Sequence, residues 1–238
     1  MIKLLSALAF IFSTFFFSSF AHAQAEQQIK TEIQKKLGAN VKVRGVSAAP
    51  VPGLYEVLVG NEVFYTDASG KYLIQGEIIE LASGKNITEQ RQADLNRIKW
   101  TDLNQANAIK TVRGNGSRQL AVFSDPNCGY CKRLEKSLQQ LDNVTVYTYL
   151  VPILGADSVQ KSKLISCASD PYKAYMDWMI NGIAPSGKSD CSTPLDKNVT
   201  FAKTYGITGT PTLFFIDGSR FPGAVQISDI EKKFSSLK

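Results

Sequence analysis

The chain has 238 residues, 27 of them basic and 21 acidic, with a net charge of +6, four cysteines and a single histidine, His22. The modest positive charge is spread along the chain without a basic run, so the composition does not favour a nucleic acid as partner. Because we expect His22 to be removed with an export signal, the remaining chain has no histidine, which excludes Ser-His-Asp, Cys-His and histidine-ligated metal chemistry. Cysteine is then the strongest nucleophile available.

Residues 1–23 are typical of a signal peptide. Lys3 precedes an apolar and aromatic stretch from Leu4 to Phe20, and Ala21-His22-Ala23 has the small-x-small pattern of a cleavage site. We expect cleavage after Ala23, and an uncleaved membrane anchor is the less favoured alternative because hydroxyl residues dilute the stretch. The sequence therefore predicts an exported protein in an oxidising compartment.

Residues 24–84 form a predicted α+β domain with a small antiparallel sheet. An amphipathic helix is expected over 26–37, where Ile29, Ile33 and Leu37 recur every fourth residue. Strands are expected over 54–59, 62–66 and 71–81, separated by turn sequences. So small a unit has a thin core and open sheet edges, which favours dimerisation; packing on its own catalytic domain is the alternative.

A linker helix is predicted within residues 85–104. Thr88 is placed to cap a polar helix from Glu89 to about Trp100, and only Leu95 and Ile98 supply apolar contacts along it. Such a helix is expected to hold two domains apart.

Residues 105–238 alternate between strands and helices as expected of an α/β, thioredoxin-like fold with a helical insertion. Thr193 with Pro194 is expected to start one helix, and Ser228 with Glu231 is expected to form a capping box on the last helix. The predicted strands are 120–123, 144–151, 211–216 and 220–225, and the predicted helices are 132–141, two pieces within 158–181 broken at Asp170-Pro171, a third ending at Gly206, and the last one.

The motif Cys128-Gly129-Tyr130-Cys131 lies directly between the first of these strands and the first helix. Backbone N–H groups and the dipole at a helix start favour the thiolate form of the exposed first cysteine. Cys128 is therefore the candidate nucleophile and Cys131 its resolving partner. The same spacing could be half of a zinc site, but that needs a second close pair or histidines, which the chain lacks.

Cys167 and Cys191 are interpreted as a structural disulfide that closes a loop of about 25 residues and contributes roughly 3 kcal/mol. A second redox pair is the alternative, although the wide spacing offers the two thiols no shared helix start. Four cysteines allow three pairings, and proximity makes 128–131 with 167–191 the preferred one.

Three segments together resemble the DsbC family of exported disulfide isomerases: FSDPNCGYC at 123–131, TGTPT at 208–212 and YTDASGKYLIQG at 65–76. The Gly129-Tyr130 dipeptide is more similar to DsbC than to its relative DsbG. The order of a small domain, a linker helix and a thioredoxin-like domain also resembles that family over almost the whole mature chain.

The resemblance implies a cystatin-like N-terminal dimerisation domain, a periplasmic location and a Cys128–Cys131 dithiol that works without cofactor or metal. It implies a cis bond between Thr210 and Pro211, in a segment that binds extended substrate, and a redox-tuning role for Gly129 and Tyr130. The implied partners are misoxidised exported proteins, a second copy of the chain and a membrane reductase of the DsbD type. A DsbA- or DsbG-like oxidant or reductase and a chaperone with little isomerase activity remain alternatives.

One position departs from thioredoxin itself. Val122 stands six residues before Cys128, where thioredoxins carry a buried acid. We therefore expect Cys131 to need water or another group to take its proton.

Overall fold

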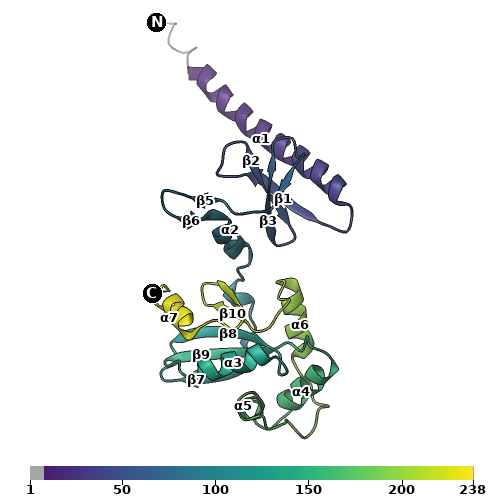
Figure 1. Cartoon of the computed structure of the whole chain (residues 1–238), viewed down its shortest axis with the longest axis vertical. Helices are drawn as coiled ribbons and strands as arrows, with labels where there is room; N and C mark the ends of the chain where they lie inside the picture. Colours follow the sequence, from purple (N-terminus) through teal and green to yellow (C-terminus); the bar gives the residue numbers. More distant parts are fainter. Residues whose placement is uncertain (1–7, 238) are drawn as a thin grey trace. The chain divides into compact units, whose positions relative to one another are not determined.

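The computed structural model describes residues 8–237 of the chain, with side chains from residue 23 onward (Figure 1). These residues divide into two compact units, one ending at Leu95 and one beginning at Asn96. No helix among the described residues is both long and apolar enough to cross a membrane. Each unit is described below by itself.

The first unit packs one long helix against a four-stranded antiparallel sheet of order β1-β2-β3-β4. Ile29 and Ile33, two of the residues that predicted the helix, lie in the core with Val43 and Val57 of the sheet. Its elements are α1 (Leu8–Leu37), β1 (Val43–Ala48), β2 (Leu54–Val59), β3 (Glu62–Asp67) and β4 (Leu73–Ile74). The expected α+β architecture is confirmed, although strand β1 was not predicted.

Helix α1 begins well before the predicted start at Glu26 and continues through the predicted cleavage site after Ala23. Lys3 and the first residues of the predicted signal lie outside the described part of the chain. The signal peptide therefore stays a prediction from sequence.

The single strand predicted over 71–81 is wrong. The segment forms two short strands, β4 and β5 (Ile79–Glu80), on either side of Gly76, and β5 pairs with β6 (Lys85–Asn86) in a separate ribbon. A glycine inside an apolar run weakens a strand and allows such a break.

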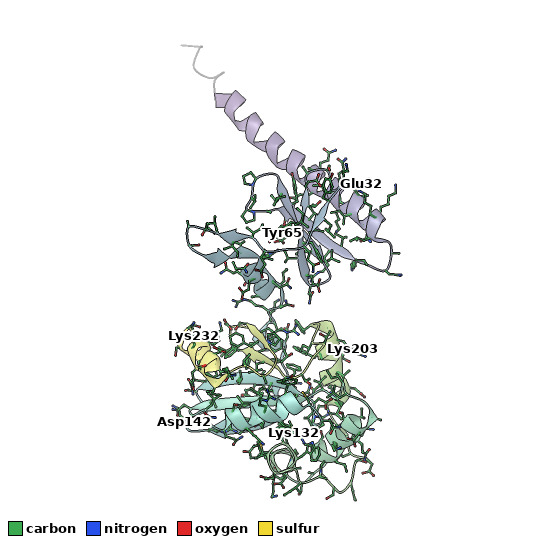
Figure 2. The ribbon with its side chains drawn as sticks, viewed as in Figure 1. Glu32, Tyr65, Lys132, Asp142, Lys203 and Lys232 are labelled. Atoms are coloured by element: carbon green, nitrogen blue, oxygen red, sulfur yellow. A yellow bond between two sulfur atoms is a disulfide. The ribbon has the colours of Figure 1, made fainter. Side chains whose placement is uncertain are left out.

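The linker helix is shorter than predicted and is not free. Helix α2 spans Ile87–Leu95, and the side chain of Asn86, not Thr88, accepts the N–H of Glu89 at its start. Thr88 is buried instead, with its Oγ1 2.6 Å from the hydroxyl of Tyr65 (labelled in Figure 2). Helix α2 packs on the first unit, whereas Ile98 and Leu103, further along the same segment, are buried in the core of the second.

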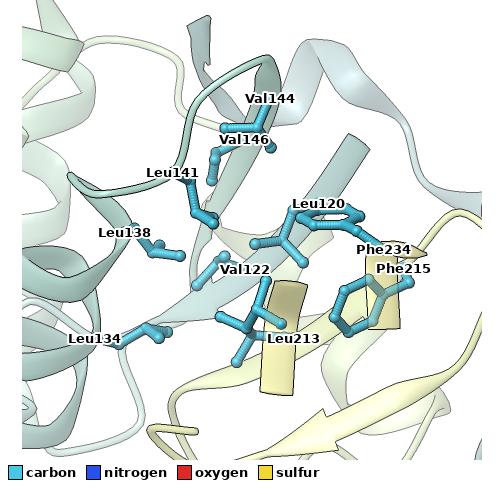
Figure 3. Close-up of a cluster of buried hydrophobic side chains, with 11 residues drawn as sticks. Leu120, Val122, Leu134, Leu138, Leu141, Val144, Val146, Leu213, Phe215 and Phe234 are labelled. Carbon is cyan, nitrogen blue, oxygen red and sulfur yellow. The ribbon is translucent and has the colours of Figure 1, made fainter. Parts of the chain in front are cut away.

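The second unit is built on a five-stranded sheet of order β11-β10-β8-β9-β7, in which only β8 and β9 are parallel. Leu120 and Val122 of β8 face a core formed with α3 and α7 (Figure 3), whereas Ala121 and Phe123 face the core on the other side. The strands are β7 (Ile109–Arg113), β8 (Arg118–Ser124), β9 (Val144–Leu150), β10 (Thr212–Phe215) and β11 (Arg220–Pro222); the helices are α3 (Gly129–Leu138), α4 (Ala156–Ser166), α5 (Pro171–Asn181), α6 (Leu195–Thr204) and α7 (Ile227–Ser235).

The two-piece helical insertion is present as α4 and α5, with Asp170 capping α5 as the break at Asp170-Pro171 indicated. Both capping predictions further along are wrong. Pro194 itself occupies the N-cap of α6, and Gln226 occupies that of α7, in each case without a side-chain cap. Glu231 pairs instead with Arg118 of β8. Strand β7 was not predicted.

Candidate functional site: the Cys128–Cys131 dithiol

Cys128 occupies the N-cap of α3, immediately after the loop that follows β8. Its sulfur accepts a hydrogen bond from the backbone N–H of Cys131 at 3.4 Å and donates one to the carbonyl oxygen of Thr210 at 3.2 Å. An N–H group directed at the sulfur from a helix start stabilises negative charge on it. The local sequence of strand, loop and helix therefore places Cys128 where a nucleophilic sulfur is favoured.

Thr210 and Pro211 reach the dithiol from a distant part of the sequence, and the bond between them is cis. They immediately precede β10, which pairs with β8 so that Thr212 lies opposite Phe123. The sheet register thus brings the two motifs of the resemblance together at the same end of neighbouring strands.

Neither thiol is openly exposed. Cys128 is 6% exposed and Cys131 2%, so the expectation of an exposed first cysteine is wrong for this state of the protein. Tyr130 between them is 61% exposed, with the Arg133 guanidinium 5.1 Å from its ring centroid. At Gly129 a side chain would meet no atom within 4 Å, so packing within this chain does not require glycine there.

Asp125, which sequence reasoning missed, fixes the loop in front of Cys128. It is completely buried, and its carboxylate accepts hydrogen bonds from the backbone N–H groups of Asn127, Ile153 and Leu154 and from the Ser158 hydroxyl, at 2.8 to 3.0 Å. A buried carboxylate is stable only when its oxygens are satisfied in this way. The Asp-Pro-Asn sequence signals a turn, but not its partners in the β9–α4 loop.

The helical insertion holds the same loop from the other side. The indole N–H of Trp178 donates to the carbonyl oxygen of Pro126 at 2.6 Å, and the ammonium group of Lys132 (labelled in Figure 2) lies 3.6 Å from the Trp178 ring centroid. Burial, and to a lesser degree the charges of Lys161 and Lys136, lower the pKa of Lys132. The insertion therefore positions the active-site loop and the first turn of α3.

A chain of buried polar groups runs inward from Cys131. The Ser124 hydroxyl lies 3.0 Å from that of Tyr175, which donates to a carboxylate oxygen of Glu135 at 3.5 Å. The other oxygen of Glu135 is 3.9 Å from a terminal nitrogen of Arg113. Sequence reasoning missed all four residues. Of the four, only Glu135 could have been inferred from the sequence, because it lies one helical turn after Cys131 and so on the same face of α3.

Burial dominates the ionisation of this chain. Burial raises the pKa of the Cys131 thiol to about 12. Interactions that stabilise the thiolate, the largest of them from Ser124, partly offset this increase. Burial raises the pKa of Glu135 to about 7 against the opposing effect of Arg113. It also raises the pKa of Tyr175 well above its ordinary value.

The other two cysteines are bonded to each other. Cys167 at the end of α4 is joined to Cys191 in a disulfide, whereas Cys128 and Cys131 are free thiols. The structure therefore contains the preferred pairing without a closed bridge at the dithiol.

Comparison with known proteins matches both units to described families. Residues 105–238 match the thioredoxin-like domain, and residues 20–89 match the disulfide bond isomerase protein N-terminal domain. The described second unit has the fold expected of the former.

The curated relatives described below are all named thiol:disulfide interchange protein DsbC. A probable thiol:disulfide interchange protein DsbC from Bordetella pertussis is 40% identical over 181 residues, covering 76% of this chain and 64% of that protein. DsbC from Escherichia coli K12 is 28% identical over 217 residues, covering 87% and 86% of the two chains. A crystal structure of a disulfide interchange protein from Neisseria gonorrhoeae has a TM-score of 0.54 and 38% identity, covering 56% of this chain and 97% of that one. The matched region thus spans less than two thirds of the Bordetella relative.

Proposed function

Because this chain belongs to the DsbC family of thiol:disulfide interchange proteins, we propose that it isomerises non-native disulfides in exported proteins. The observation that carries the proposal is the place of Cys128 at the start of α3, between the Cys131 N–H and the Thr210 carbonyl. The enzyme is a thiol:disulfide oxidoreductase whose reacting groups are the two sulfurs, without a cofactor.

In the reaction, the Cys128 thiolate attacks one sulfur of a substrate disulfide, and the other substrate sulfur leaves with the electron pair and takes up a proton. The freed substrate thiol, as thiolate, then attacks a different sulfur within the substrate, and a substrate thiolate finally displaces Cys128. Substrate and enzyme are unchanged in oxidation state, and only the pairing of the substrate cysteines in disulfides differs. Alternatively, Cys131 displaces the substrate, which leaves reduced while the Cys128–Cys131 disulfide forms.

We assign Thr210 and Pro211 to substrate binding. The carbonyl of Thr210 meets the Cys128 sulfur at the rim of the site, where an extended substrate strand would need a backbone partner. Gly129, where a side chain would find open space, and the exposed ring of Tyr130 would face that strand and tune the reactivity of the dithiol.

We assign homodimerisation to the first unit. Strand β4 ends its sheet, and the apolar residues Leu73 and Ile74 on it are each 43% exposed, with Tyr72 61% exposed beside them. An edge strand with exposed apolar side chains is stabilised by pairing with another chain. The occupant we propose is β4 of a second copy, which would also give the assembly two dithiols for an unfolded client.

We assign the protein to the periplasm, with residues 1–23 as its signal. The Cys167–Cys191 disulfide supports an oxidising compartment. An isomerase there must have its dithiol kept reduced, and a membrane reductase of the DsbD type is the donor we propose. Mass spectrometry after alkylation of the protein taken from its native compartment would then find two blocked thiols and one intact bridge.

The test of the activity is refolding of scrambled ribonuclease. Cys128→Ser should lose the isomerisation and keep the fold, and a variant that works as well as the wild type would contradict the proposal. A pure chaperone would still suppress client aggregation with both cysteines replaced. A dithiol oxidant would be isolated oxidised and monomeric, and light scattering at micromolar concentration distinguishes that monomer from the dimer.

A further inference from the structure

The proposed reaction leaves open what takes the proton from Cys131 when this thiol resolves a mixed disulfide. The thiol is 2% exposed, so bulk water does not reach it freely, and Val122 occupies the position of the thioredoxin acid. A buried thiol must lose its proton before it can attack, because the thiolate is the nucleophile. The fold therefore needs a proton acceptor inside the second unit.

Glu135 is a buried carboxylate one helical turn from Cys131, 5% exposed and connected to it by hydroxyl groups. Tyr175 from α5 stands between them, 3.5 Å from Glu135 and 3.0 Å from the hydroxyl of Ser124 at the end of β8. Ser124 in turn lies close enough to Cys131 for its hydroxyl to lower the pKa of that thiol, as a hydrogen bond to the thiolate does. The groups come from three elements, and they form one continuous chain.

The surroundings of Glu135 allow both its charged and its neutral form. The charged and titratable groups that face it are Arg113 from β7, Tyr175 from α5 and, through Tyr175, the Cys131 thiol on its own helix. The side-chain amide of Gln139, one turn further along at the end of α3, also donates a long hydrogen bond of 3.4 Å to one carboxylate oxygen. Arg113 approaches only to 3.9 Å, and its two terminal nitrogens have no hydrogen-bond partner among the described residues. Since this ion pair is loose, burial keeps the pKa of Glu135 at about 7, where a carboxylate can both accept and release a proton at physiological pH.

Resting on the proposed function, we infer that Glu135 accepts the proton of Cys131 during resolution, through the hydroxyls of Ser124 and Tyr175. Glu135 does not touch the reacting sulfurs and acts as a positioning and proton-accepting group. The role assigned to it is specific to the second half of the reaction, because Cys128 attacks first and Cys131 has to lose its proton only when it resolves the mixed disulfide.

The proton balance is complete. The S–H proton of Cys131 passes to the Ser124 oxygen, the Ser124 proton to the Tyr175 oxygen and the Tyr175 proton to Glu135. The buried negative charge thereby moves from the carboxylate to the sulfur, so no second buried charge is created. The Cys131 thiolate attacks the Cys128 sulfur, the bond from Cys128 to the substrate sulfur breaks, and the substrate thiolate leaves with the electron pair and is protonated by water. Glu135 later returns its proton to solvent.

The experiment follows both half-reactions in one stopped-flow trace of the full chain with the aromatic disulfide dithiobis-nitrobenzoate. Attack by Cys128 releases the first coloured thiolate at a rate that depends on reagent concentration. Resolution by Cys131 releases the second at a rate that does not. If wild type lacks the first, concentration-dependent phase, the proposed function fails before Glu135 is tested. If it shows the first phase and lacks the second, resolution by Cys131 fails, and the role of Glu135 fails with it.

Glu135→Gln should leave the first phase unchanged and slow the second at least about tenfold, the lower range for a lost general base. In the wild type the second phase should rise with pH through about 7, and the variant should lose this inflection. Tyr175→Phe interrupts the chain without removing a charge and should slow the same phase. A charge-matched control is Glu231→Gln, which lies on α7 in an ion pair with Arg118 and should change neither phase.

The inference is overturned if Glu135→Gln and Tyr175→Phe both keep the wild-type rate of the second phase, or if the wild type shows no inflection near neutral pH. Should Glu135→Gln fail to fold because Arg113 is left unpaired, Tyr175→Phe decides the matter alone. A slower first phase in either variant would point to a general distortion of the dithiol and would also contradict the assignment.

Discussion

The sulfur of Cys128 lies 3.2 Å from the carbonyl oxygen of Thr210, although 82 residues separate them in the chain. In the proposed mechanism, the contact accounts for how a cysteine that is only 6% exposed would serve a large substrate. A hydrogen bond from a thiol to a carbonyl is weak, and an incoming backbone N–H can replace it at that oxygen. In that mechanism, binding of the substrate backbone at Thr210 would also release the nucleophile.

Cys131→Ala should trap substrates on the enzyme. Without the resolving thiol, a mixed disulfide at Cys128 can be released only by a second thiol of the substrate. Mass spectrometry of non-reduced protein should show covalent adducts with Cys131→Ala and none with Cys128→Ala. Equal adduct levels in the two variants would mean that Cys128 is not the attacking sulfur.

Asp125→Ala should destabilise the second unit by about 3 kcal/mol or more, because it leaves buried N–H donors without an acceptor. Urea unfolding followed by circular dichroism measures the loss. Asp157→Ala is the matched control on the same side of the loop. Its side chain is exposed and pairs with Lys161 and with the Asn127 side-chain amide, so its removal leaves no buried donor unpaired and its unfolding midpoint should stay much nearer that of the wild type. A comparable loss in both variants would refute the role of Asp125.

Glu135 should make stability depend on pH. Burial raises its pKa from the ordinary 4.5 to about 7, so between these values the folded protein holds a proton that the unfolded chain releases. The stabilisation from this group is complete below about pH 4.5 and is lost as the pH rises through about 7. Relative to Glu135→Gln, the wild type should therefore lose roughly 3 kcal/mol over this interval. Urea unfolding at a series of pH values gives the difference, and a difference independent of pH would count against the buried carboxylate.

Replacing Cys167 and Cys191 together by serine should lower the free energy of unfolding by about 3 kcal/mol, since the bridge closes a loop with a sequence separation of 24. The effect should appear in thermal unfolding. Because the hydrogen-bond partners of the Cys128 sulfur are Thr210 and Cys131, the first phase of the reaction with the aromatic disulfide should be unchanged. A loss of that phase would indicate that the second pair takes part in the chemistry.

Leu73→Asp should convert the proposed dimer into a monomer, because it places a charge on an apolar edge strand that another chain would cover. Light scattering measures the mass. Leu81→Asp, at a residue 93% exposed outside β4, provides the control and should remain dimeric. A dimeric Leu73→Asp would move the interface away from β4.

Features of the chain encoded by local pattern could be predicted from the sequence. The alternation in Leu120 to Phe123 places successive side chains on opposite faces of β8, and the strand-loop-helix context places Cys128 at the start of α3. The helix ends were less accessible. Ser228 and Glu231 have capping-box spacing, but an ion pair with Arg118 takes Glu231 to the sheet instead.

The buried chain behind Cys131 could not be predicted, because it depends on how α5 packs on α3. Tyr175 and Glu135 are 40 residues apart, and no periodicity in either helix identifies the other as its neighbour. The same limit applies to Asp125, whose partners come from the loop after β9. Local sequence indicates where a turn occurs, whereas tertiary packing decides which distant donors meet it.

The coexistence of one closed bridge and two free sulfurs within the second unit has a consequence for biogenesis. A newly synthesised copy has to join Cys167 to Cys191 while leaving the pair at 128 and 131 available, and either alternative pairing would yield an inert enzyme. Under the proposed function, maturation is therefore a pairing problem of the same kind that finished copies of the enzyme would solve for their substrates. On the same proposal, correctly bridged molecules that are already present would speed the maturation of new ones.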